Sequence, residues 1–216
     1  MFDEKRMLDT IHKQRRDVVQ NNVEFLNDKL YLEFGTCHGA SMLEYYSLYK
    51  EHNIQNNSFY GFDSFKGLPI EENDPLTVWK EGEFSTGGHI NPGLLNKPDM
   101  IIMDGWFCDT LNDNTAKMFY DKKAGLIHID CDIYTSTIEV LEFVVKHNLL
   151  TDGTILVYDD WGAWRQAGLT EDKQYDIAEG RAHREICEKY NLNFELVNKV
   201  VPVDEFYEIA TFVYKQ

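Results

Sequence analysis

The sequence lacks the features that mark several specialised protein classes. None of its apolar runs approaches the roughly eighteen residues of a membrane-spanning helix, and its mean hydropathy is −0.44. Its four cysteines, Cys37, Cys108, Cys131 and Cys187, include no pair with CxxC spacing, so a zinc site is not expected. The first ten residues hold no apolar stretch typical of a signal peptide, and scattered cysteines fit reduced thiols. We expect a cytoplasmic protein that does not bind membranes.

Basic residues are also scarce. The chain has 21 Lys and Arg against 37 Asp and Glu, which gives a net charge of −16. The largest basic cluster is Lys13, Arg15 and Arg16, on an expected helix. A nucleic-acid-binding surface needs a larger basic face, whereas an acidic surface suits a metal ion or a cationic cofactor. We therefore expect no nucleic-acid partner.

Length and composition are those of an ordinary globular domain. The chain has 216 residues, of which 43% are hydrophobic and 27% charged. There are no repeats and no linker that would divide it. We expect a single domain over residues 1–216, with an N-terminal helical segment at 1–28.

Helical and strand patterns alternate along the chain. Strands are expected at 29–34, 58–63, 100–103, 125–130, 154–158, 194–201 and 207–214. Helices are expected at 3–26, 41–51, 110–121 and 180–190, with another helix that follows Ser136. Capping boxes are expected at Ser41/Glu44 and Ser136/Glu139, and a turn carrying Pro202 and Asp204 joins the last two strands. This order predicts an α/β fold with an open, mostly parallel sheet that closes in an antiparallel strand pair.

Ligands of such sheets bind beyond the carboxyl ends of the strands. Gly35 and Gly39 follow the first strand and allow close backbone approach to a ligand, although they do not form a GxGxxG fingerprint. Asp63 ends the second strand, where a carboxylate can accept the hydroxyls of a ribose or can cap the next turn. The tract Asp104–Phe107 ends the third strand, and its aromatic residues either line a pocket or belong to the core.

Four acids follow the fourth and fifth strands. They are Asp130 and Asp132 in one tract and Asp159 and Asp160 in the other. Such carboxylates would repel one another unless a cation neutralised them, and oxygen ligands suit Mg²⁺ or Ca²⁺. The alternative is that Asp132 and Asp160 turn outward as helix caps. His128 shares a strand face with Asp130, and it either lines the site or is a core histidine; roles for His183 and Arg181 stay open.

Five tracts together resemble the macrocin O-methyltransferase family of class I S-adenosylmethionine (SAM)-dependent methyltransferases. They are LEFGTCHG (32–39), FDSFKGLP (62–69), GWFCDTL (105–111), HIDCDIYTST (128–137) and YDDW (158–161). The resemblance implies a Rossmann-like, seven-stranded sheet with helices on both faces. It also implies SAM and Mg²⁺, or another divalent cation, as cofactors.

The resemblance assigns roles to individual residues. The implied cofactor-binding residues are Glu33, Gly35, Thr36, Gly39, Asp63, Ser64, Asp104 and Trp106, and the implied metal ligands are Asp130, Asp159 and Asp160. Asp130 is also the implied general base. The expected function is metal-assisted O-methylation of a small-molecule hydroxyl, such as a sugar or vicinal diol.

Two alternatives and several details stay open. Asp130-Cys131-Asp132 has the Asp-x-Asp form of a metal-dependent glycosyltransferase, and the chain could be a non-catalytic SAM-binding protein. Residues 67–98 form a long connection that we expect to be a lid or acceptor wall. Its candidate wall residues are Trp79, Phe84, Gly87, Gly88 and His89. A homodimer through the N-terminal helix is a further possibility.

Overall fold

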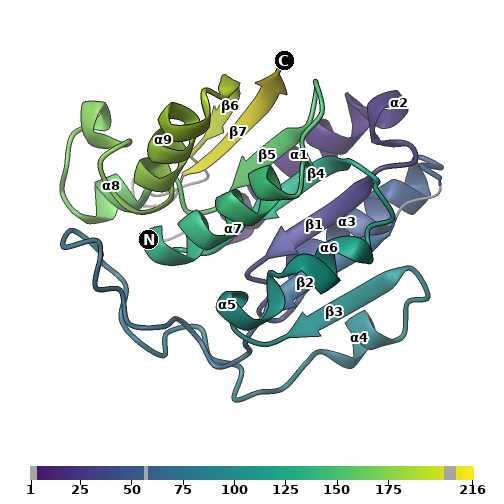
Figure 1. The fold of residues 1–216 in the computed structure, drawn as a ribbon, viewed down its shortest axis with the longest axis horizontal. Helices are drawn as coiled ribbons and strands as arrows, with labels where there is room; N and C mark the ends of the chain where they lie inside the picture. The colour runs from purple at the N-terminus through teal and green to yellow at the C-terminus, as the bar shows by residue number, and fades with distance from the viewer. Residues whose placement is uncertain (1–3, 56–57, 202–207) are drawn as a thin grey trace.

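The computed structural model describes residues 4–55, 58–201 and 208–216. These residues contain one seven-stranded sheet in the order β3-β2-β1-β4-β5-β7-β6 (Figure 1). The strands are β1 (Leu30–Phe34), β2 (Phe59–Asp63), β3 (Met100–Asp104), β4 (Ala124–Ile129), β5 (Ile155–Tyr158), β6 (Asn193–Val200) and β7 (Ile209–Lys215). The first five strands are parallel, and β7 and β6 form the antiparallel end. The predicted fold class is confirmed.

Helices cover both faces of this sheet (Figure 1). The helices are α1 (Glu4–Gln20), α2 (Val23–Leu26), α3 (Ala40–Glu51), α4 (Pro92–Leu95), α5 (Phe107–Thr110), α6 (Asp113–Lys117), α7 (Tyr134–Lys146), α8 (Ala163–Gln166) and α9 (Ala178–Tyr190), with a 3₁₀ turn η1 (Glu171–Lys173). α7 and α9 pack on one face, and α1 and α3 pack on the other. No helix in the described part of the chain is long and apolar enough to cross a membrane.

The central strands are nearly continuously apolar in sequence because helices cover both faces of the sheet. In β1, Leu32 and Phe34 join the core under α7, while Tyr31 points to the opposite core beside α3. This alternation follows from the two-residue period of a strand. All five residues of β1 are buried, as are all six of β4.

Two predicted helices are broken in the structure. The helix expected at 3–26 ends at Gln20, and α2 follows after a turn in which Asn22 donates to the Val18 carbonyl oxygen (2.8 Å). The helix expected at 110–121 begins earlier, at Phe107, and is divided into α5 and α6. Asn112 causes this division because its side chain caps α6. In both places an asparagine competes with the backbone for hydrogen bonds.

Both predicted capping boxes are wrong. α3 begins at Ala40, after Gly39 at φ +74°, so Ser41 lies inside the helix and donates to Glu33 instead. Ser136 also lies inside its helix, α7, where a carboxylate from a distant loop, Glu71, accepts the Thr135 amide (2.7 Å). The short elements α4, α8 and η1 were not expected. The predicted turn carrying Pro202 and Asp204 lies outside the described residues.

The carboxyl ends of the parallel strands lie at one edge of the sheet. Phe34 of β1 pairs in register with Phe62 of β2 and with Ile129 of β4, which in turn pairs with Tyr158 of β5. The polar residues that follow these four positions therefore come together. Their loops form the candidate site.

Candidate active site

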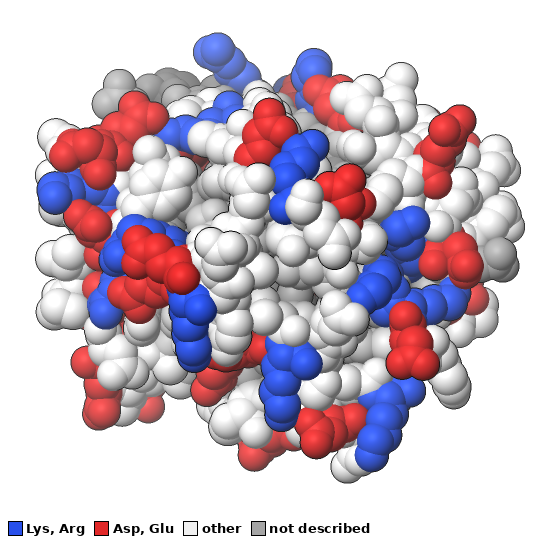
Figure 2. Space-filling view, turned by 45° about the horizontal axis from the view of Figure 1, so that its top comes forward, with Lys and Arg blue, Asp and Glu red and all other residues white. Residues whose placement is uncertain are grey.

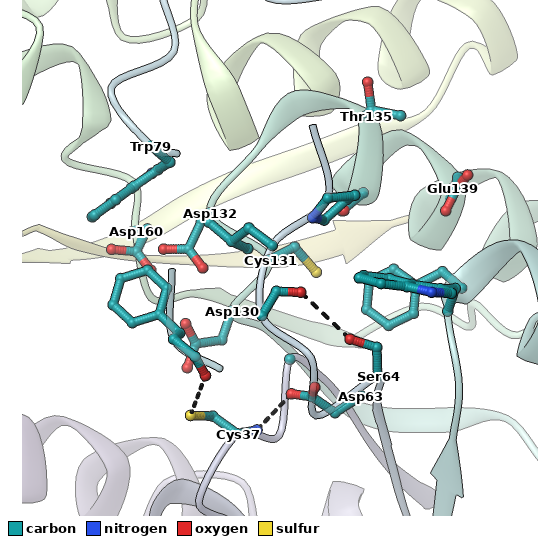
Figure 3. A pocket seen from close by; sticks show the side chains of 18 of the residues that line it. Cys37, Asp63, Ser64, Trp79, Asp130, Cys131, Asp132, Thr135, Glu139 and Asp160 are labelled. Carbon is teal, nitrogen blue, oxygen red and sulfur yellow. Dashed lines mark hydrogen bonds between the residues drawn. The ribbon is translucent and has the colours of Figure 1, made fainter. Parts of the chain in front are cut away.

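A cavity of about 580 Å³ opens at this edge of the sheet (Figure 3). Its walls come from the loops after all five parallel strands, from the start of α7 and from the 67–98 segment. Each of the five strand ends contributes to the cavity lining, through Gly35, Asp63, Gly105, Asp130 and Asp160 in chain order. The cavity lies where the sequence places ligand binding.

Three carboxyl groups converge in this cavity. Asp130, Asp132 and Asp160, named the acid cluster below, each offer an oxygen, and these oxygens all lie within 4.8 Å of one another. Figure 3 shows the side chains of Asp132 and Asp160 pointing toward each other. They do not turn outward as helix caps, so that alternative is wrong.

The acid cluster is electrostatically strained in the absence of a cation. Burial, and then repulsion by neighbouring carboxylates, raises the pKa of all three groups well above the ordinary range of aspartic acid. Oxygen atoms are its only donors, and hard cations such as Mg²⁺ prefer oxygen ligands. The donor set therefore fits a divalent cation.

Asp159 is the predicted metal ligand that lies outside the acid cluster. Its Oδ1 lies 3.3 Å from Nε2 of His128 and 3.8 Å from a guanidinium nitrogen of Arg15 on α1. Asp159 still adds to the repulsion that raises the pKa of Asp130. The predicted metal ligands and the acid cluster thus share Asp130 and Asp160. The third residue is Asp159 in the prediction and Asp132 in the acid cluster.

His128 is a buried core histidine and does not line the cavity. Burial lowers its pKa, but hydrogen bonds and charge interactions with Asp159 and Glu33 outweigh burial and raise the pKa to about 10. The ring is therefore charged at neutral pH. It lies between Glu33, the cross-strand neighbour on β1, and Asp159 at the end of β5.

Glu33 lies beneath the site. Its side chain is fully buried and accepts hydrogen bonds from Ser41 (2.9 Å) and from the Tyr31 hydroxyl. Glu33 does not line the cavity, and neither do Thr36, Gly39 and Asp104, although all four are predicted to bind cofactor. Asp104 is exposed at the end of β3.

The loop after β1 brings the backbone into the cavity at Gly35. Its φ is +87°, and a Cβ there would lie 1.8 Å from the Asp130 carbonyl oxygen. Only glycine fits so close to the neighbouring strand end. Gly39 instead packs against the side chain of Leu94 and is the N-cap residue that precedes α3.

Of the residues predicted to bind cofactor, Gly35, Asp63, Ser64 and Trp106 line the cavity. Asp63 accepts the amides of Cys37 and Phe65, both at 2.6 Å, so it also holds two loops. Burial is the main cause of its raised pKa. Each carboxylate oxygen has a further lone pair for a ligand hydroxyl.

Several residues line the cavity that were not predicted as site residues. Cys37, Cys108 and Cys131 all line the cavity, as do Thr135, Ser136 and Glu139 of α7. Burial raises the pKa of each of these thiols, so they are not activated nucleophiles. Glu139 was expected only as part of a capping box, because a place in the cavity depends on where α7 begins.

The 67–98 segment crosses from β2 to α7 and α9. Trp79 and Phe84 line the cavity, whereas Gly87, Gly88 and His89 do not. Glu71 accepts from the backbone and hydroxyl of Thr135, and Asp74 accepts the Ala178 amide (2.7 Å). These anchors could not be predicted, since they join residues far apart in sequence.

His183 and Arg181, both on α9, do not line the cavity. His183 is buried, which lowers its pKa to about 3, and its Nδ1 lies 3.0 Å from the Tyr158 hydroxyl. Arg181 forms an ion pair with Glu185 and donates to the carbonyl oxygen of Asn73. Both residues therefore have structural contacts.

The chain is similar to known methyltransferases. Residues 32–161 match the family model described as "Methyltransferase domain". The O-methyltransferase NovP superimposes with a TM-score of 0.69 at 15% identity, covering 96% of this chain and 80% of NovP. The calicheamicin methyltransferase CalS11 gives 0.70 at 19% identity, with 94% and 78% covered.

A further solved structure shares the fold with a lower TM-score. MycE, solved with Mg, SAH and mycinamycin VI, gives a TM-score of 0.51 at 12% identity, with 92% of this chain and 48% of MycE covered. No curated protein matches the sequence. The family match covers more than half of the chain, and the fold agrees with it. The chain belongs to the methyltransferase-domain family and has the fold of the class I SAM-dependent methyltransferases.

Proposed function

We propose that the protein is a SAM-dependent, divalent-metal-assisted O-methyltransferase that acts on a small-molecule hydroxyl. The observation that carries this proposal is the position of the acid cluster, which lines the same cavity as Gly35 and Asp63. A cofactor beside the glycine loop and a cation at the acid cluster would thus share one cavity. Macrocin O-methyltransferase-like enzymes are the subfamily that the sequence tracts favour.

For the cofactor, the residues that line the cavity are the candidates for direct contact. Gly35 leaves room for close approach, Asp63 offers carboxylate oxygens to ribose hydroxyls, and Trp106 offers an aromatic wall. SAM supplies a methyl group on a positively charged sulfur. Glu33, buried beneath the loop, would act by holding His128 and the start of α3.

For the metal, Asp130 and Asp160 are proposed ligands on both sequence and geometric grounds. Geometry favours Asp132 as the third ligand over Asp159, since Asp159 faces His128. A divalent cation supplies positive charge that lowers the pKa of an acceptor hydroxyl and offsets the acid cluster.

Asp130 is the proposed general base. It is only partly buried, and it faces the cavity from the end of β4. With SAM and an acceptor bound, Asp130 would accept the proton of the acceptor hydroxyl, while SAM would supply the methyl group and leave as S-adenosylhomocysteine.

The acceptor is proposed to be a sugar or another vicinal diol. Leu68, Pro69, Ile70, Trp79 and Phe84 form an apolar wall on the 67–98 segment, and we propose that this segment is the lid. Lys and Arg side chains are interspersed with Asp and Glu on the face shown in Figure 2. Together with the net charge of −16, this distribution supports a small-molecule acceptor rather than a nucleic acid.

The alternatives have less support. Membership of a methyltransferase family argues against a glycosyltransferase, although the acid cluster includes both acids of the Asp-x-Asp tract. A non-catalytic SAM-binding protein would not need three carboxyl groups that converge in the cofactor cavity. Asp130→Asn distinguishes an enzyme from a non-catalytic SAM-binding protein. In an enzyme, this substitution should abolish turnover but leave cofactor binding intact.

The test is calorimetric titration with S-adenosylhomocysteine, with and without Mg²⁺. We expect binding in both conditions, because the cofactor residues are separate from the acid cluster. Methyl transfer to a diol acceptor should then stop on addition of EDTA. No binding in either condition would overturn the proposal, and EDTA-resistant turnover would overturn its metal part.

A further inference from the structure

Glu179 is a fully buried acid on α9 that no sequence motif marks. Its Oε1 accepts the Cys131 amide and its Oε2 accepts the Asp160 amide, both at 3.2 Å. Cys131 lies between Asp130 and Asp132. The side chain of Glu179 therefore joins the two loops that carry the acid cluster.

The contacts explain why a carboxylate is present at this position. Two backbone N–H donors face one side chain, so that side chain must offer two acceptors. Glutamine offers only one acceptor oxygen and would turn its own N–H₂ group toward the other amide.

The start of α9 holds Glu179 in a fixed position. The Ala178 amide donates to Asp74, which is itself buried. A Cβ on Gly180 would lie 1.8 Å from the Gln174 carbonyl oxygen, so the first turn of the helix is pressed against the preceding loop. Neither contact allows the backbone of Glu179 to shift freely. Its carboxylate can therefore hold the two loops at a fixed separation.

From this geometry we propose that Glu179 is a positioning residue, which sets the spacing of the metal-ligating acids by fixing the loops after β4 and β5. Glu179 is not one of the carboxyl groups that converge in the acid cluster, so it acts through the backbone of Cys131 and Asp160. This inference rests on the proposed metal site.

The test measures Mn²⁺ affinity by electron paramagnetic resonance in the full-length protein without acceptor. Glu179→Asp keeps the charge but is one methylene shorter, so it cannot reach both amides. Glu179→Gln removes the charge and one acceptor. Glu188, a mostly exposed acid on the same helix, provides the matched controls Glu188→Asp and Glu188→Gln.

Positioning predicts that both Glu179 variants bind Mn²⁺ about 10–100-fold more weakly, while both Glu188 variants bind like the wild type. S-adenosylhomocysteine affinity should stay within about twofold of wild type in all of them. Normal Mn²⁺ affinity in Glu179→Asp would overturn the proposal. A weaker affinity in Glu179→Gln would then come from the lost charge and not from the lost contacts with the two amides. If the wild type binds no Mn²⁺, the proposed metal function itself fails.

A measurement on the unsubstituted protein covers the case in which a Glu179 variant does not fold. The Cys131 and Asp160 amides should exchange with solvent slowly by NMR, even without metal, because Glu179 holds both. Exchange at the rate of exposed loop amides would overturn the proposal.

Discussion

The acid cluster should cost stability when no cation is bound, and Asp132→Asn tests this directly. Asp132 is buried and lies with Asp130 and Asp160 inside a 4.8 Å group of oxygens. Asparagine has nearly the same shape, removes the charge and can donate a hydrogen bond to a neighbouring carboxylate. The variant should be more stable than the wild type in EDTA.

The size of the gain follows from the spacing of the carboxylates. Two unit charges 4.8 Å apart repel by about 3.5 kcal/mol at an effective dielectric constant of about 20. The raised pKa values mean that protonation already relieves part of this repulsion. We therefore expect a gain of about 2 kcal/mol, or about 4–8 °C in Tm for a chain of this length.

The assay is thermal unfolding at about pH 8, in EDTA and in Mg²⁺. Wild-type protein should gain stability from Mg²⁺, and Asp132→Asn should gain much less. Asp121→Asn is the matched control, because Asp121 is exposed and has a left-handed backbone that asparagine also tolerates. It should respond to Mg²⁺ like the wild type.

Two results would refute this reasoning. If Asp132→Asn unfolds at a lower temperature than the wild type in EDTA, the carboxylates do not repel one another as described. If Mg²⁺ stabilises both proteins equally, Asp132 takes no part in holding a cation.

Three further predictions concern pH, the buried histidine and the glycine loop. The pKa values of the acid cluster are raised, so its contribution to stability is present at low pH and is lost as pH rises above the ordinary pKa of aspartic acid. Tm in EDTA should therefore fall as pH rises from about 4, and Mg²⁺ should flatten the slope. His128→Asn should cost about 3–5 kcal/mol in urea unfolding at neutral pH, because it removes the positive charge that lies between the buried carboxylates of Glu33 and Asp159. The stabilising charge of His128 is fully present below its ordinary pKa and is lost as pH rises through about 10, so the wild type and the variant should converge in stability there. Gly35→Ala should cost about 2–4 kcal/mol and weaken S-adenosylhomocysteine binding, whereas Gly168→Ala, also at positive φ but with open space around it, should cost about 1 kcal/mol. Equal losses in the two glycine variants would show that strain from φ, and not the clash with Asp130, determines the effect.

The sheet could be predicted because its signals are local. Strands covered on both faces are continuously apolar, and β4 and β5 show this pattern in their sequences. The meeting of the acids at one edge follows from the parallel arrangement of the strands. The convergence of Asp130 and Asp160 was predictable for the same reason.

Details that depend on tertiary contacts could not be predicted. Asp159 turns from the acid cluster because Arg15, from a helix more than a hundred residues earlier, and His128 lie beside it. Ser136 is not a helix cap because Glu71, from a distant loop, caps α7 in its place. Glu179 has no local signal at all, since its partners lie on two other loops.

The most direct test of the central claim is a crystal structure with S-adenosylhomocysteine and Mn²⁺, with anomalous scattering used to locate the ion. We predict one Mn²⁺ peak within coordination distance of Asp130, Asp132 and Asp160, in the same cavity as the cofactor beside Gly35 and Asp63. A cofactor-bound structure without an ion at the acid cluster would contradict metal-assisted catalysis. An ion held by Asp159 in place of Asp132 would contradict the ligand set proposed from the geometry.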